Sequence, residues 1–263
     1  MSAETILETR QGAVLTLTLN RPQARNAMSL AMIEELESAL KAAQEDESVR
    51  VLVLRGAGGH FCAGGDIKDM GKARHATLDG PKDPVATLNA RFGYLALAFA
   101  RTPLPVIAVV EGAVMGGGFG LACTADLTIA LQSADFRLPE TSLGVLPAQI
   151  APFLVERLGY SEAKRLALSG ARINAEAALA VGLVHEVCSD SEIEEALQKH
   201  LDAFLRCAPG ATAATKKLLV ERYASVNEET IEAASRAFAK AVRSDEAVEG
   251  MTAFIQKRAP KWN

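Results

Sequence analysis

The first half of the chain alternates between segments with a strand period and segments with a helix period. Residues Val14–Leu19 read VLTLTL, and this alternation of apolar and polar positions predicts a half-buried strand. Val49–Leu54 predicts a second strand, Val106–Val110 a buried third and Asp126–Leu131 a fourth. Strands that alternate with helices along the chain are typical of an α/β body.

Helical periods fill the intervals between these strands. Ser29 is a predicted N-cap because apolar residues follow it at helical spacing, at Leu30, Ile33, Leu36 and Leu40. Asp79–Arg101 predicts a second helix, which Pro103 and Pro105 end. The partly overlapping segment Lys68–Thr87 carries mixed charge and is interpreted as a loop.

The pattern changes at about residue 148, where strand signals thin out to a short VHEV at 184–187. Two apolar helical faces follow, formed by Leu197, Leu201, Phe204 and Leu205 and by Ile231, Ala234, Phe238 and Val242. We therefore predict an α/β core over residues 1–195 and a helical region over residues 196–263. Periodicity leaves open whether these faces dock on a neighbouring subunit or on the chain's own core.

Composition narrows the classes of protein that such elements can form. The chain has 263 residues, 49% of them hydrophobic and 23% charged, with a net charge of −4. This balance argues against a nucleic-acid partner, which would need a basic surface. The start MSAETILETR is too acidic for a signal peptide, and charges and prolines interrupt the longest apolar stretch, so we expect no membrane association.

The spacing of cysteines and histidines predicts no metal site. The four histidines form no HExxH or similar short motif. The four cysteines lie far apart without a CxxC pair, which predicts buried thiols in a reducing compartment and hence a cytoplasmic protein; they are Cys62, Cys123, Cys188 and Cys207.

A first glycine-rich stretch, HFCAGGDIKDM, follows a predicted strand. Gly64 and Gly65 precede Asp66, which is better suited to N-cap a helix than to act as an acid. The N–H groups at the start of a helix lack helical partners, and the helix dipole there favours negative charge. The stretch can therefore present free backbone donors.

A second stretch, EGAVMGGGFGLACTAD, repeats this layout after Val106–Val110. Gly116–Gly118 lead into a predicted helix over Gly117–Thr124, which gives a second set of free N–H groups. Either stretch taken alone can equally be an ordinary tight turn.

A third stretch, FRLPETSLGVLPAQIAPF, places Glu140 among apolar neighbours. Taken alone, Glu140 is better interpreted as a solvated acid in a first helical turn. The glycines do not fit GxGxxG, and neither GxxxxGK[ST] nor GxSxG occurs. Two sets of N–H donors and one acid, without a serine or cysteine nucleophile at either turn, suit a reaction that stabilises an oxyanion while a carboxylate moves a proton.

These stretches resemble signatures of the enoyl-CoA hydratase/isomerase (crotonase) superfamily, in its order and spacing. The matching segments cover nearly the whole chain and are LNRPQARNAMS, HFCAGGDIKDM, GAVMGGGFGLACTADLTIA, PETSLGVLP and EGMTAFIQKRAP. The resemblance implies a crotonase-like α/β fold of repeated ββα units with a C-terminal helical region for trimerisation. It also implies acyl-CoA thioester substrates and a homotrimer or a dimer of trimers.

The resemblance further implies roles for individual residues. The backbone N–H groups of Gly65 and Gly117 would form an oxyanion hole, and Glu140 matches one of the family's two catalytic glutamates. No metal is expected, and no cofactor beyond coenzyme A, which is part of the substrate. The residues expected to bind the substrate are Gln23, Ala24, Arg25, Ala63, Gly64, Asp66, Ile67, Gly116, Gln149, Phe254 and Lys257.

The chain departs from the two-glutamate members at Gly120, where they carry their second acid. The leading hypothesis is an enoyl-CoA hydratase with Glu140 as general acid and base. The alternatives are a Δ3–Δ2 enoyl-CoA isomerase and a non-catalytic acyl-CoA-binding protein. The family's glycine-rich segment after LGxxP is replaced by AQIAPF, which places Gln149 in the predicted pocket. GVLPAQIAPF is similar to hydratases of isohexenylglutaconyl-CoA or methylglutaconyl-CoA.

Overall fold

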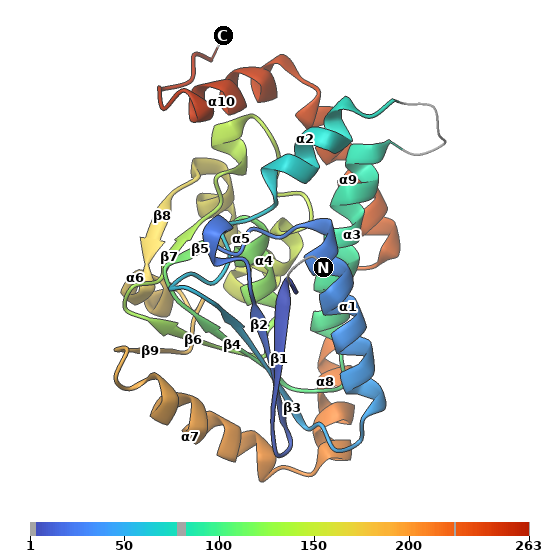
Figure 1. Ribbon diagram of the computed structural model, residues 1–263, viewed down its shortest axis with the longest axis vertical. Coiled ribbons are helices and arrows are strands. Elements are labelled where there is room, and N and C mark those ends of the chain that lie inside the picture. The colour runs from blue at the N-terminus through green and yellow to red at the C-terminus, as the bar shows by residue number, and fades with distance from the viewer. Residues whose placement is uncertain (1–3, 78–82, 224, 263) are drawn as a thin grey trace.

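The computed structural model describes residues 4–77, 83–223 and 225–262. Within these residues the larger sheet has six strands in the order β1-β2-β3-β4-β6-β9 (Figure 1). Neighbouring strands are parallel except for β1 and β2, which are antiparallel. The strands are β1 (Ile6–Gln11), β2 (Val14–Leu19), β3 (Val51–Gly56), β4 (Val106–Val110), β6 (Leu127–Leu131) and β9 (Glu186–Cys188).

Helices cover both faces of this sheet, because successive side chains of a strand point to opposite faces. Leu52 and Leu54 of β3 join the main core, into which α1, α3, α4 and α5 also pack. Val51 and Val53 join a second apolar cluster with α7. The helices are α1 (Leu30–Glu45), α2 (Ile67–His75), α3 (Pro84–Arg101), α4 (Gly117–Thr124), α5 (Ala151–Ser169), α6 (Ala175–Ala180), α7 (Ile193–Leu205), α8 (Pro209–Tyr223), α9 (Glu228–Val242) and α10 (Asp245–Ile255), with 3-10 turns η1 (Pro22–Ala24) and η2 (Glu140–Leu143).

A smaller sheet lies beside the larger one and carries the loops of the candidate site. Its order is β5-β7-β8, with β5 (Ala113–Met115), β7 (Asp135–Arg137) and β8 (Arg172–Asn174). β5 pairs with β7 in parallel register, Met115 opposite Arg137. The chain after β5 and the chain after β7 therefore leave this sheet at the same edge.

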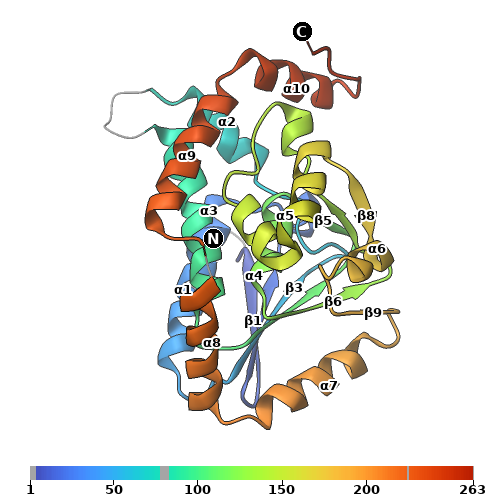
Figure 2. The same cartoon turned by 180° about the vertical axis from the view of Figure 1, so that it is seen from behind.

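The C-terminal helices pack on the chain's own body. Ile231 of α9 belongs to the main core, and Phe238 and Val242 lie in a cluster with Val85 of α3. Figures 1 and 2 show α10 and α7 at opposite ends of the long axis. α8 leaves Leu218 exposed. The apolar face of α9 is thus covered within the chain, and the predicted trimer stays a prediction.

Most of the predicted elements are confirmed, but some differ in their bounds, and one predicted burial is wrong. The segment Lys68–Thr87 is not a loop throughout, because α2 continues to His75 and α3 begins at Pro84. Residues 78–82 lie outside the described residues, and the predicted helix 79–101 is therefore observed only from Pro84 to Arg101. Cys207 is exposed rather than buried. The strand predicted at 184–187 is Glu186–Cys188. α7 crosses residue 195 and packs on the sheet, and the division there stays a prediction.

Candidate active site

The two glycine turns that the sequence singles out lie side by side. Cys62 donates its N–H to Ala113 O and accepts from Met115 N, both at 2.9 Å, as neighbouring strands do. A Cβ built on Gly64 would lie 3.4 Å from Met115 O and 3.9 Å from the Cα of Gly116. The loop after β3 and the loop after β5 therefore form one surface, although fifty residues separate them.

Glycine is required at this junction for two physical reasons. Gly64 has a φ of +105° and Gly116 a φ of +51°, which side chains rarely adopt. A Cβ on Gly118 would lie 2.4 Å from Cys62 O, which leaves no room for one. Glycines at these positions allow the two backbones to approach each other and leave the backbone open to a ligand.

Each turn presents a backbone N–H without an acceptor in the part of the chain that the structure describes. Gly65 is held between two hydrogen bonds, from Met28 N to Gly64 O and from Asp66 N to Met28 O, but its own N–H makes none. Gly117 is the first residue of α4, where no residue of the preceding turn accepts its N–H. These are the two donors that the sequence analysis predicts for an oxyanion hole.

Glu140 lies against the same junction. It begins η2, and a Cβ built on Gly116 would lie only 2.9 Å from its Oε1 atom. Part of the residue reaches the surface, but Oε2 is buried and has no hydrogen-bond partner in the described structure. Burial raises the pKa of Glu140 to about 7, against a hydrogen bond from its own backbone and the charge of Arg137. The interpretation of Glu140 as a solvated first-turn acid is therefore wrong.

Arg137 connects the acid to the second glycine turn. Its carbonyl accepts from Gly116 N at 3.1 Å, which fixes the turn to β7. Its side chain donates to Gly170 O at 3.1 Å and to Ser142 Oγ at 3.3 Å, so it fixes η2 as well. The backbone carbonyl of Arg137 thus positions the turn before Gly117, and its side chain positions the turn that carries Glu140.

Apolar side chains surround the position where the family's other acid would stand. A Cβ on Gly120 would lie 3.0 Å from Ile150 Cγ1 and 3.2 Å from Phe92 Cζ. The same ring would lie 3.4 Å from a Cβ on Gly117. A carboxylate at position 120 would therefore require these groups to move.

The predicted substrate-binding residues before α2 lie close to this junction. Gln23 and Ala24 form η1, and Arg25 directly after it accepts from Ala63 N at 3.0 Å. Asp66 accepts from the backbone N–H groups of Lys68 and Asp69, so its predicted role as an N-cap is confirmed. Arg21 binds Asp66 at 2.6 Å, and the hydrogen bonds lower the pKa of Asp66 although burial opposes them. Ile67 is exposed.

Other predicted residues have different surroundings. The buried Gln149 donates to Asn89 Oδ1 and to Ile231 O, each at 2.9 Å, so its amide connects α3 to α9. Phe254 is exposed on α10, and Lys257 follows that helix with a φ of +53°. The substrate contacts of all three residues stay predictions.

The sequence analysis missed Asn26, which shapes the first turn. Asn26 has no exposed surface and a φ of +57°. Its side chain donates to Ala57 O and His60 O and accepts from Arg21 N. Asparagine tolerates a left-handed φ, so an asparagine in the turn RPQARNA was the feature of the sequence that could have indicated this role.

The described ranges, residues 4–77, 83–223 and 225–262, lack the features of a metal site and of a membrane span. They contain no group of three or more histidine, cysteine, aspartate or glutamate side chains that could hold a metal ion. None of the helices in these ranges combines the length and the apolar character that a membrane span requires.

Two free N–H donors beside one buried carboxylate define an enzyme-like site that can polarise a carbonyl and move a proton. Comparison with known proteins agrees: a family model described as enoyl-CoA hydratase/isomerase matches residues 9–263. The chain belongs to this family and has the crotonase fold, with acyl-CoA metabolism as its setting.

Individual relatives cover the chain almost completely. It is 50% identical to the solved enoyl-CoA hydratase/isomerase of Marinobacter aquaeolei, over 99% of each chain, with a TM-score of 0.82. It is 52% identical to Pseudomonas aeruginosa AtuE, over 98% of each chain, with a TM-score of 0.81. It is 35% identical over 257 residues to 2,3-dehydroadipyl-CoA hydratase of Escherichia coli (strain K12), over 97% of each chain. Its relatives include enoyl-CoA hydratases and a carnitinyl-CoA dehydratase, and the chain is an enzyme of this hydro-lyase group.

Proposed function

We propose that this enzyme adds water to a 2-enoyl-CoA thioester, with Glu140 as the general base and then the general acid. The observation that supports the proposal is the contact of Glu140 with the junction of the two turns, where the N–H groups of Gly65 and Gly117 have no acceptor in the described structure. The thioester oxygen would accept from Gly65 N and Gly117 N. We assign the CoA part of the substrate to the residues of η1, the loop Ala63–Ile67 and the α10 region.

The reaction then follows from the charges. Glu140 takes a proton from water, and the water oxygen forms a bond to the β-carbon. The π pair of the C=C bond then forms a double bond between the α-carbon and the thioester carbon, and the π pair of the C=O bond moves to the oxygen, where the two N–H donors would stabilise the enolate. Glu140 returns the proton to the α-carbon, and the 3-hydroxyacyl thioester is complete. Loss of one such donor costs about 2.7–4 kcal/mol of transition-state stabilisation.

The raised pKa of Glu140 supports this assignment. A group that takes up a proton and then releases it is most effective when its pKa lies near the working pH. Burial brings the pKa of Glu140 to about 7, where both forms are populated at neutral pH. Glu140 can therefore both take up a proton from water and release it again at neutral pH, as the reaction requires.

An isomerase is the second candidate, and the surroundings of Gly120 favour it. Phe92 and Ile150 fill the place where a second carboxylate would help to hold water. A Δ3–Δ2 isomerase needs only one carboxylate, because the proton leaves one carbon and returns to another. The same oxyanion hole would serve both reactions.

Turnover in heavy-oxygen water separates the two reactions. Incubation with 2-enoyl- and 3-enoyl-CoA substrates in H₂¹⁸O should give labelled 3-hydroxyacyl-CoA if the enzyme is a hydratase. An unlabelled 2-enoyl product from the 3-enoyl substrate, without hydration, would identify an isomerase instead. Glu140→Gln should lower either activity by about 10²–10⁴-fold. Glu47→Gln, at an exposed turn, is the matched control. Full activity of Glu140→Gln would remove this residue from the mechanism.

A further inference from the structure

The helix that presents the Gly117 donor is weak by its own sequence. α4 has eight residues, and three of them are glycines, at positions 117, 118 and 120. Its N-cap is Gly116, which has no side chain to bind the first N–H groups. Glycine is the weakest helix former after proline, and so short a helix is not stable alone. The position of α4 must therefore be set by contacts with its neighbours.

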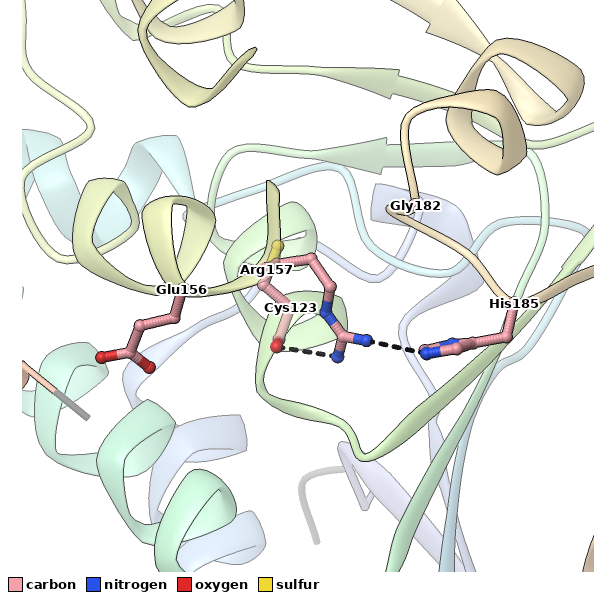
Figure 3. Close-up of a pocket in the computed structure, with 5 residues that line it drawn as sticks. All are labelled: Cys123, Glu156, Arg157, Gly182 and His185. Atoms are coloured by element: carbon pink, nitrogen blue, oxygen red, sulfur yellow. Dashed lines mark hydrogen bonds between the residues drawn. The ribbon is translucent and has the colours of Figure 1, made fainter. Parts of the chain in front are cut away.

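Besides the apolar core around Phe119 and Leu121, a charged side chain contacts the other end of the helix. Figure 3 shows the guanidinium of Arg157, from α5, between the carbonyl oxygen of Cys123 and the ring of His185. Arg157 Nη2 donates to Cys123 O at 3.0 Å and also to Ala125 O. Carbonyls at the end of a helix have no helical partner, and a cation there complements the negative end of the dipole. Arg157 thus caps α4 from outside.

The ring of His185 completes the surroundings of this guanidinium. The ring Nδ1 accepts from Thr128 N at 3.0 Å, and the backbone N–H of His185 donates to Thr128 O at 2.9 Å, so the residue is fixed on β6. Nε2 lies 3.3 Å from Arg157 Nη1. Burial first, and then the charge of Arg157, lower the pKa of His185, which favours the neutral ring. The guanidinium therefore has carbonyls on one side and an uncharged ring on the other.

α5 restrains α4 at two points. Ile150, the residue before α5, lies against Gly120 in the first half of α4, and Arg157 binds its C-terminal end. At 1.5 Å per residue the eight residues of α4 span only about 12 Å, so a shift along its axis reaches Gly117 almost undiminished. We propose that Arg157 is a positioning residue for catalysis, which fixes α4 so that the Gly117 N–H points at the thioester oxygen.

This inference rests on the proposed function, because it needs Gly117 to act as an oxyanion donor. It adds a residue that no motif identifies, on a different helix and at the far end of α4 from the chemistry. The expected loss is in the polarisation of the carbonyl, while Glu140 and the CoA contacts stay unchanged.

The test compares Arg157→Met, Arg157→Lys and the control Arg165→Met with the wild type. Arg165 also lies in α5, but beyond the break that Gly159 makes with its non-helical backbone, and it pairs with Glu162 at the surface. Arg157→Met should lower kcat for a 2-enoyl-CoA by about 10- to 100-fold with KM little changed, since small displacements of reacting groups have effects of this size. Arg157→Lys, which can donate to one carbonyl at a time, should fall in between. Arg165→Met should match the wild type.

A spectroscopic measurement separates positioning from general stability. Bound 4-dimethylaminocinnamoyl-CoA should absorb at longer wavelength when N–H donors polarise its thioester carbonyl. At probe concentrations that saturate the binding site, the Arg157→Met variant should lose most of this red shift, whereas the Glu140→Gln variant should keep it. A wild-type kcat and a full red shift in both Arg157 variants would overturn the proposal. If Arg157→Met does not fold, Arg157→Lys decides by the same two readouts.

The two proposals fail in different ways. A wild-type enzyme that binds the probe without a red shift and turns over no enoyl-CoA would contradict the proposed function, and the role of Arg157 with it. A wild-type enzyme that is active and shifts the probe, with Arg157 variants that behave identically, would contradict only the role of Arg157.

Discussion

Replacing the buried acid by its neutral isostere should make the protein more stable at alkaline pH. Burial raises the pKa of Glu140 to about 7 from its ordinary value of 4.5. The folded state therefore keeps a proton on Glu140 that the unfolded state has already lost. Removing the ionisable group in Glu140→Gln removes this penalty, while the shape of the side chain is kept.

The size of the effect follows from linkage. Below pH 4.5 Glu140 is protonated in both states, so the wild type and the variant differ least. Between pH 4.5 and about 7 only the unfolded state releases the proton, and the wild type loses stability relative to the variant at about 1.36 kcal/mol per pH unit. Above about 7 both states are ionised, and the difference levels off at about 3 kcal/mol.

Urea unfolding of the wild type and Glu140→Gln at a series of pH values from 4 to 9 measures this difference. Glu47→Gln is the control, because it removes the same charge from an exposed turn. The free-energy difference for Glu140→Gln should grow between pH 5 and 7, while that for Glu47→Gln stays flat. Parallel stability curves for the wild type and Glu140→Gln would refute the account of a buried acid without a partner.

Three further perturbations test other parts of the site. In the hydratase, kcat/KM should rise with pH until about 7 and then level off, because only ionised Glu140 can take the proton from water. Gly116→Ala should lower kcat by at least about tenfold, since its Cβ would lie 2.9 Å from Glu140 Oε1 and its φ of +51° is strained; steady-state kinetics measure this. Asn26→Ala should lower the free energy of unfolding by about 3 kcal/mol, because it leaves buried groups of the first turn unpaired; urea unfolding measures this.

Each of these outcomes has a matched comparison. Gly71→Ala in α2, where a Cβ meets no other atom within 4 Å, should keep full activity, and an equal loss there would contradict the argument for Gly116. A flat pH profile between pH 5 and 8 would mean that Glu140 is not the base. Asn26→Asp keeps the oxygen that accepts from Arg21 N, but it places a buried carboxylate oxygen against the carbonyl oxygens of Ala57 and His60. It should therefore lose at least as much stability as Asn26→Ala, and a clearly smaller loss would count against the donated hydrogen bonds.

The elements that could be predicted are those whose buried side chains form a long pattern. Val14–Leu19 and Val106–Val110 are strands as expected, and Ser29 caps α1. β1 has only Ile6 buried, and α2 has no buried residue, so neither carries a period that could be detected. The strands of the small sheet have three residues each, which is too short for any period.

Only part of the candidate site could be predicted from the sequence. The glycine turns could be found because each lies directly beside a strand or helix signal in the sequence. Their adjacency could not, because it depends on the pairing of Cys62 with Ala113 and Met115 across fifty residues. The hydrogen bonds of Gln149 were equally out of reach, since Asn89 and Ile231 belong to helices far away in the sequence.

The residues that local rules cannot explain are concentrated at this junction, and the scaffold around it supplies what they lack. Gly64 and Gly116 have left-handed φ values, Glu140 is buried without a partner for Oε2, and α4 starts on glycine. Each feature weakens the fold locally. Backbone pairing to Cys62, the two-ended contacts of Arg137 and the cap from Arg157 restrain the same segments from outside. Substitutions that relieve the strain should therefore stabilise the protein and impair catalysis, whereas substitutions in the restraints should impair both.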